Sequence, residues 1–139
     1  MGRVTVNARI ENIGDLHAAE IGAIPADKVR ALDVPDALVD TGAWGLSIPK
    51  TMLAELGLKY LKTRKAKTAA GDVDVRVFGT TRLTIQGRDT PMDVTELPDN
   101  CPVLIGQLAL EGMDFVVDMK AHKVIGNPAH GGEQVIELY

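Results

Sequence analysis

One aspartate in this chain has surroundings suited to chemistry. It is Asp40 in ALVDTGA, residues 37–43, where an apolar run reaches the carboxylate and Thr41, Gly42 and Ala43 follow. An ionised carboxylate at the end of an apolar strand is unfavourable unless nearby groups compensate for it. The chemistry open to such a group is proton transfer. The alternative is an acidic turn residue after an edge strand, and the rest of the chain has to decide between the two.

Other residues able to support catalysis or metal binding are few. Ser47 is the only serine and lies in GLSIP, which lacks the Gly-x-Ser-x-Gly pattern of serine hydrolases. His17, His122 and His130 are far apart and form no His-x-x-x-His pair, so no metal site is expected. Cys101 is the only cysteine, which excludes an internal disulfide and favours a small buried hydrophobe. Because no glycine-rich phosphate loop is present either, we expect neither metal nor cofactor.

Composition narrows the classes of partner. The 139 residues, 45% of them hydrophobic, suit one domain over residues 1–139. A net charge of −4 and an aromatic content of 4% argue against nucleic acid and anionic lipid as partners. No run approaches the ~20 apolar residues of a membrane span, and the N-terminus lacks an apolar signal region. We therefore expect a cytoplasmic protein that binds neither nucleic acid nor membrane.

The periodicity is mostly that of β-strands. Apolar and polar residues alternate, or short apolar runs occur, over residues 3–10, 72–79, 82–85, 92–97, 115–118 and 134–138. Turn residues at 86–89 and 98–100 separate some of these segments. Their lengths predict a small antiparallel β-domain or barrel.

Two helices are expected. Residues 47–58 offer Ser47 as an N-cap, Pro49 in the first turn and Gly57 as a stop. A shorter helix is predicted over residues 107–112, before the strand at 115–118. Both predicted helices are short, so the domain remains predominantly β.

Three motifs together resemble the single-domain retropepsin-like aspartic proteases, including their bacterial members. They are ALVDTGA, the segment PVLIGQLALEGMDFVVD at 102–118 with Ile105 and Gly106 in the family's apolar-apolar-Ile-Gly pattern, and a glycine-containing hairpin between them. The likeness covers roughly residues 30–126. It implies an all-β fold, a small closed barrel with one or two short helices, in which Ile105 and Gly106 lie structurally near the site.

The resemblance also implies a mechanism. Two chains each bring one Asp-Thr-Gly loop to a shared centre, so a single copy per chain implies a homodimer. Asp40 is then the catalytic carboxylate that hydrolyses a peptide or protein substrate, Thr41 holds the loops together, and Gly42 allows close approach. Ala43 lines the cleft. RDTPM at 88–92 is no second copy, because Pro91 replaces the glycine.

Residues 62–77 are the candidate flap that closes over substrate. Ala69, Ala70 and Gly71 lie near its tip, with Asp72 beside them. Small residues at the tip suit a closing hairpin that excludes water. The alternative is a solvated hairpin whose basic and acidic arms form cross-strand ion pairs.

Two positions depart from the retroviral pattern. Trp44 and Gln107 stand where retroviral enzymes commonly have a charged pair that braces the dimer. Because both charges are missing, no unpaired charge is left buried. Trp44 is either a cleft residue or a packing residue.

Two further points stay open in the sequence. The tail at 135–138 either joins the dimer interface or folds back on its own subunit. The alternative function is a catalytically silent retropepsin-fold module for dimerisation or peptide binding.

Overall fold

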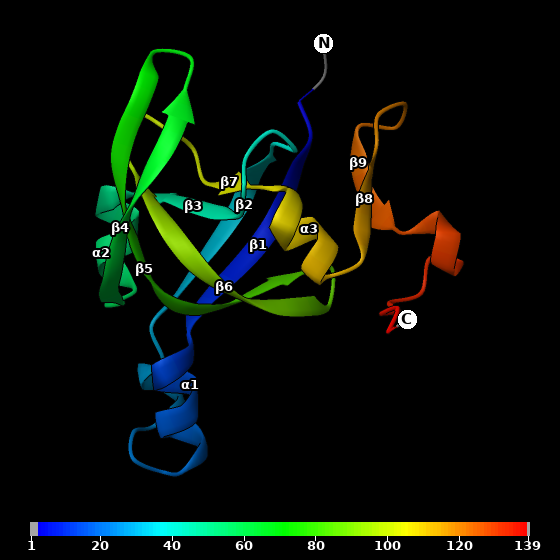
Figure 1. Ribbon diagram of the computed structural model, residues 1–139. Coiled ribbons are helices and arrows are strands. Elements are labelled where there is room, and N and C mark those ends of the chain that lie inside the picture. Colours follow the sequence, from blue (N-terminus) through cyan, green and yellow to red (C-terminus); the bar gives the residue numbers. More distant parts are fainter. Residues whose placement is uncertain (1–2, 139) are drawn as a thin grey trace.

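A seven-stranded sheet is the frame of the computed structural model, which describes residues 3–138 (Figure 1). Its strands are β1 (Thr5–Asn12), β2 (Ala31–Val39), β3 (Leu46–Pro49), β4 (Lys59–Thr68), β5 (Gly71–Ile85), β6 (Arg88–Leu97) and β7 (Leu104–Ile105). The order is β1-β2-β7-β3-β6-β5-β4, and β1 also pairs with β5. Six strands thus close into a barrel and β4 lies outside the ring. The predicted all-β closed barrel is confirmed.

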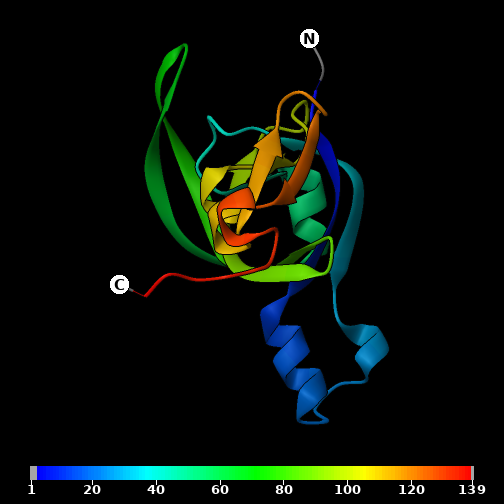
Figure 2. The same cartoon turned by 90° about the vertical axis from the view of Figure 1, so that its right-hand side faces the viewer.

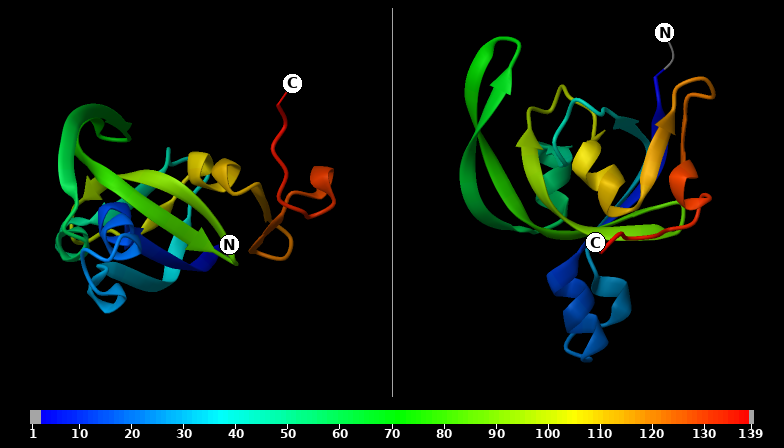
Figure 3. Two further views of the ribbon diagram at one scale, coloured as in Figure 1. Left: turned by 90° about the horizontal axis from the view of Figure 1, so that it is seen from below. Right: turned by 45° about the vertical axis from the view of Figure 1, so that its right-hand side comes forward.

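Short helices and a second hairpin surround the barrel. They are α1 (Ile13–Glu20), η1 (Ala26–Lys28), α2 (Lys50–Glu55), α3 (Gln107–Gly112), η2 (Pro128–His130) and the β8 (Phe115–Asp118)–β9 (Lys123–Gly126) hairpin. Figure 2 shows α1 and η1 projecting from the end of the barrel opposite the tip of the β4–β5 hairpin. In the right-hand view of Figure 3, α3 lies between the β4–β5 and β8–β9 hairpins.

The core follows from strand alternation. In β1 the side chains of Val6, Ala8 and Ile10 point inward and are buried, whereas the residues between them are exposed. Leu110 and Met113, from α3 and the residue after it, pack into the same core with 1% and 0% exposure. Helix α3 therefore packs on one side of the barrel, which fixes its place next to the loop that follows β2.

The predicted helix at 47–58 begins later than expected. Ser47 lies inside β3, opposite Leu104 and Thr95, and caps no helix. Leu46 and Ile48 on either side of it are fully buried, so the alternation of a central strand prevails over the capping preference of serine. Pro49 becomes the N-cap of α2, and Gly57, with a φ of 59°, ends the helical segment as predicted.

Most predicted strands are present, with one exception. The segments at 72–79 and 82–85 are one strand, β5, and the helix at 107–112 has the predicted bounds. Gln86 and Gly87 connect β5 to β6 with φ of 50° and 80°, as a two-residue hairpin turn requires. The predicted strand at 134–138 is wrong, because those residues pair with no strand.

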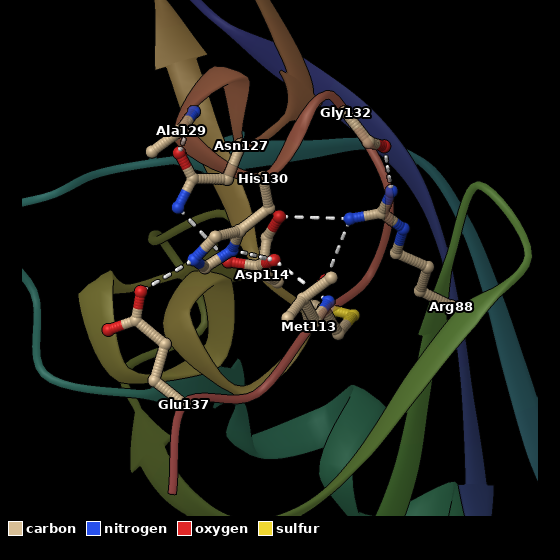
Figure 4. A network of polar contacts seen from close by, with 9 residues as sticks. Arg88, Met113, Asp114, Asn127, Ala129, His130, Gly132 and Glu137 are labelled. Carbon is tan, nitrogen blue, oxygen red and sulfur yellow. Dashed lines mark hydrogen bonds and ion pairs between the residues drawn. The ribbon is translucent and has the colours of Figure 1, made fainter. Parts of the chain in front are cut away.

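The C-terminal segment is instead fixed by side chains around Asp114 (Figure 4). The Asp114 carboxylate accepts hydrogen bonds from the Asn127 amide group and the Val135 backbone amide, and lies 2.6 Å from Nδ1 of His130. Nε2 of His130 lies 3.0 Å from Glu137. The contact with His130 and then the Val135 amide lower the pKa of Asp114 to about 2. The two carboxylates, Asp114 first, raise the pKa of His130.

Arg88 connects the same cluster to β6. Its guanidinium donates to the carbonyl oxygens of Met113, Asp114 and Gly132, and stacks 4.6 Å from the ring centre of Phe115. One planar side chain therefore joins β6, the turn after α3 and the start of the tail. Within the single chain the tail folds back on its own residues, which is one of the two arrangements expected from the sequence.

Candidate active site

Asp40 directly follows the last residue of β2, at one end of the barrel. The backbone amide of Asp40 donates to the carbonyl of Ile105 at 2.9 Å, and Leu38 and Val39 pair in parallel with β7. These backbone contacts fix the point at which the chain leaves the sheet. Asp40 is exposed at that point, so the single chain does not bury the carboxylate.

The loop after β2 orients this carboxylate. The Gly42 amide donates to Oδ1 of Asp40 at 2.9 Å, and the Ala43 amide donates to the Asp40 carbonyl at 3.0 Å. A Cβ on Gly42 would lie 3.2 Å from the same Oδ1, which is tighter than ordinary contact. Thr41 and Gly42 are exposed and Ala43 is half-buried. The Asp-Thr-Gly turn therefore holds Oδ1, and Oδ2 accepts no hydrogen bond from residues 3–138.

The first turn of α3 holds the loop from the other side. The amides of Gly106, Gln107 and Leu108 donate to the carbonyls of Gly45, Ala43 and Trp44 at 2.7, 3.1 and 2.9 Å. The first amides of a helix lack partners within the helix, and here the loop supplies them. The structure thus brings together the two predicted motifs, Asp40 to Ala43 and Ile105-Gly106, which are far apart in the sequence.

Gly106 is required for this close approach. A Cβ at this position would lie 2.6 Å from the carbonyl oxygen of Ala43 and 2.7 Å from the carbonyl carbon of Trp44. Both are backbone atoms that cannot move aside without displacing the loop. The glycine of the Ile-Gly motif therefore sets how closely α3 supports the loop that carries Asp40.

The β4–β5 hairpin extends beyond the barrel at the end that carries the Asp40 loop (Figure 1). Ala69 and Ala70 form its turn, and Gly71 has a φ of 114°, which disfavours any side chain. The Thr68 hydroxyl donates to the Gly71 carbonyl at 2.7 Å and accepts from the Ala70 amide at 3.2 Å. Asp72 follows as an exposed residue of β5. The predicted tip of the hairpin is therefore in place, and its role as a flap stays a prediction.

Trp44 lies at the edge of a cleft between the loop and the hairpin. Trp44 is 68% exposed in the single chain, so it is not part of the barrel core. The cleft has a volume of about 370 Å³, and its lining includes Trp44, Arg64, Val77, Met92 and Leu108. The cleft thus brings together a residue four positions after Asp40 and residues of both hairpin strands. Trp44 lines this cleft, and its role in binding a substrate stays a prediction.

Gln107, at the second position that departs from the retroviral pattern, has its own partner. Its side-chain amide donates to Oε1 of Glu111, one turn later in α3, at 3.2 Å. Residues four apart lie next to each other on a helix. Gln107 therefore takes part in a contact within α3 and leaves no buried charge near Trp44.

The remaining chemistry-bearing residues lie away from the Asp40 loop. His17 and His122 are exposed, and His130 lies in the C-terminal cluster. Cys101 is half-buried, so the prediction of a buried thiol was wrong: the turn after β6 leaves it partly open. Within residues 3–138, no three His, Cys, Asp or Glu side chains are grouped as a metal site requires. In the same range, no helix has the length and apolar character needed to cross a membrane.

Comparison with known proteins identifies the family. The family described as gag-polyprotein putative aspartyl protease matches residues 33–116, which is more than half of the chain. The matched range contains the Asp40 loop, the β4–β5 hairpin and the first turn of α3. A search of the curated proteins finds no match. The chain belongs to the gag-polyprotein aspartyl protease family, with a retropepsin-like barrel.

Proposed function

We propose that the protein is an aspartic endopeptidase that hydrolyses peptide bonds through two Asp40 side chains, one from each subunit of a homodimer. The observation that carries this proposal is the exposed Asp40 carboxylate, which its own loop orients at the end of a barrel of an aspartyl protease family. Aspartic catalysis needs two carboxylates, and this chain has one Asp-Thr-Gly. A second copy of the chain is the simplest source of the other.

The pairing of two Asp40 carboxylates also explains how a carboxylate at the end of an apolar strand can act in catalysis. Two carboxylates about 3 Å apart cannot both be ionised at low cost, so the pair shares one proton. In the single subunit Oδ2 of Asp40 is open, while Oδ1 accepts from Gly42. The two-fold related Oδ2 is thus available to face its counterpart. The pair then holds one acid and one base at the same pH.

The reaction follows from this protonation state. The ionised carboxylate takes a proton from a water molecule, whose oxygen attacks the carbonyl carbon of the substrate. The protonated carboxylate gives its proton to the carbonyl oxygen, which forms a tetrahedral diol. When the diol collapses, the carbon–nitrogen bond breaks, the leaving nitrogen takes the proton of the protonated carboxylate, and one diol hydroxyl gives its proton to the other carboxylate. The products are a carboxylic acid and an amine, and the carboxylates return to sharing one proton.

The surrounding residues have supporting roles in this proposal. Thr41, next to Asp40 and exposed, braces the two loops across the two-fold axis. Gly42 lets the substrate backbone approach, and Ala43 lines the cleft beside it. The turn at Ala69 to Gly71 closes over the peptide and excludes water. Rigid support of the loop by α3 keeps the carboxylate oriented without any substrate present.

The direct test is peptide cleavage by purified wild-type protein and by the Asp40→Asn variant. The asparagine side chain has the size of the aspartate and keeps an oxygen that can accept the hydrogen bond from the Gly42 backbone N–H. The variant should therefore fold. The proposal predicts cleavage by the wild type and a loss of at least about a thousand-fold in the variant. A variant that cleaves at the wild-type rate overturns it.

A further inference from the structure

The β4–β5 hairpin has two chemically different faces. Side chains alternate between the faces of a strand, and directly paired residues share a face. On the outer face, the strand register places Lys65 opposite Asp74 and Lys67 opposite Asp72, so these two lysines each have a carboxylate at the opposite position, without a direct ion pair. Arg76 is on this face too, opposite Thr63, and forms its ion pair with Glu96 of β6. Every cation of the outer face therefore has a carboxylate nearby.

The inner face consists of Lys62, Arg64, Ala66, Val73, Val75 and Val77. Here Lys62 pairs with Val77 and Arg64 pairs with Val75, so both cations face valines. None of the ion pairs formed within residues 3–138 includes Lys62 or Arg64. The inner face is therefore apolar in the middle and positively charged at one edge, and none of its six residues is acidic.

The inner face borders the cleft described above. Val77, 5% exposed, and Arg64 both line it, together with Trp44. Asp93 also lines this cleft, but its Oδ1 accepts a hydrogen bond from the Thr80 hydroxyl at 2.7 Å. Arg64 is the one cation among the residues that line the cleft, and it forms no ion pair with Asp93 or with any other acid of residues 3–138. The cleft is open to one further carboxylate beside Arg64.

We infer that this cleft binds an acidic side chain of the substrate, with Arg64 as the residue that selects it. This inference rests on the proposed endopeptidase function and names its substrate class: peptides with Glu or Asp near the scissile bond. The guanidinium binds the carboxylate, while Trp44 and Val77 contact the aliphatic stem. A glutamate can make both contacts better than an aspartate, because its aliphatic stem is one methylene longer.

Chain geometry limits where the acidic residue lies. Asp40 and Trp44 are four positions apart, and four residues of chain span at most about 14 Å. An extended peptide covers that distance in about four residues. The acidic side chain therefore lies within about four residues of the bond that is cut. In the dimer the second subunit offers the same cleft on the other side of that bond.

The test measures binding and cleavage separately. Two pools of random decapeptides without tryptophan are made, identical except that one central position is Glu in one pool and Gln in the other. Binding to the Asp40→Asn protein is followed by the fluorescence of Trp44, the only tryptophan. Cleavage by the wild type is followed by mass spectrometry. We expect the Glu pool to bind about five- to ten-fold more tightly, with the same preference in KM and little change in kcat.

Three variants assign this preference to Arg64. Arg64→Gln removes it, and Arg64→Glu shifts it towards a third pool with Lys at the central position. Lys65→Gln, the matched control, removes a neighbouring cation from the outer face and keeps the preference. Because Arg64 and Lys65 are both exposed, the melting temperatures of the three variants should match that of the parent.

The outcomes separate this inference from the proposed function. A wild type that cleaves both pools equally, a preference that survives Arg64→Gln, or no change in Trp44 fluorescence with any pool overturns the inference alone. A wild type that cleaves no peptide, although the Glu pool binds through Arg64, overturns the endopeptidase function and leaves acidic recognition in place.

Discussion

The amide of Gly106 donates a hydrogen bond to the carbonyl of Gly45 at 2.7 Å. This bond joins the Ile-Gly motif to the loop that carries Asp40, across about 60 residues of chain. Two further amides of α3 donate to the same loop. The candidate site is therefore a loop clamped on a helix end, and its geometry depends on the distance between the two.

Gly106→Ala should disturb this clamp. The new Cβ would meet backbone atoms of Ala43 and Trp44 at 2.6 to 2.7 Å, so the loop has to shift. We expect the free energy of unfolding to fall by about 1–3 kcal/mol, as for overpacked cores. Denaturant unfolding measures this, and peptide cleavage should fall with it.

Gly45→Ala is the matched control for that variant. A Cβ on Gly45 would lie 3.6 Å from Sδ of Met92, which is ordinary contact. Its effect on the free energy of unfolding should stay below about 1 kcal/mol. Equal losses in the two variants would show that the close approach at Gly106 has no special role.

The cluster around Asp114 and His130 should hold the C-terminal segment less firmly both at low pH and at high pH. The pKa of Asp114 is lowered from 3.8 to about 2, so its contribution to stability is present above pH 3.8 and is lost as the pH falls towards 2. The pKa of His130 is raised from 6.5, so its contribution is complete below pH 6.5 and is lost as the pH rises through the raised value. The segment is thus held best between these limits.

Hydrogen exchange of the Val135 amide, which donates to Asp114, reports this directly. After correction for the intrinsic rate, protection should be greatest between about pH 4 and 6.5 and fall on either side. In His130→Gln the loss on the alkaline side should disappear, whereas the loss on the acidic side remains. An unchanged alkaline loss in this variant would mean that another group is responsible.

Peptide cleavage should depend on pH in a different way. Two carboxylates that share a proton titrate as a pair, so the rate should follow a bell-shaped curve whose two limbs belong to the pair. We expect the optimum at acidic pH. A rate that rises steadily through alkaline pH, or one that requires added zinc, contradicts the proposed chemistry.

Local signals in the sequence were sufficient for much of the barrel and for the turn that carries Asp40. The Asp-Thr-Gly turn and the helix at 107–112 are defined by residues within a few positions of each other, and the structure places both as predicted. The contact between them depends on the barrel. Only the resemblance to a family indicated that Asp40 and Gly106 lie together.

Elements that depend on distant partners were missed. Helix α1 buries no residue, so no apolar periodicity marks it, and it is fixed by the Asn12 cap and the ion pair of Asp15 with Arg30. Residues 134–138 have strand-like alternation but no strand to pair with. Ser47 has the side chain of a helix cap, yet pairing with β6 and β7 places it in a strand. In each case tertiary contacts outweigh local preference.

The central claim is that one active site contains Asp40 from two chains, and subunit mixing tests it most directly. Equal amounts of wild-type and Asp40→Asn chains are denatured together and refolded, and mass analysis verifies that mixed dimers form. Random pairing leaves about a quarter of the dimers fully wild type, and mixed dimers have one carboxylate and should be inactive. The activity per dimer should therefore be about a quarter of the wild-type value. A value near one half, which independent sites in each chain would give, contradicts the shared site.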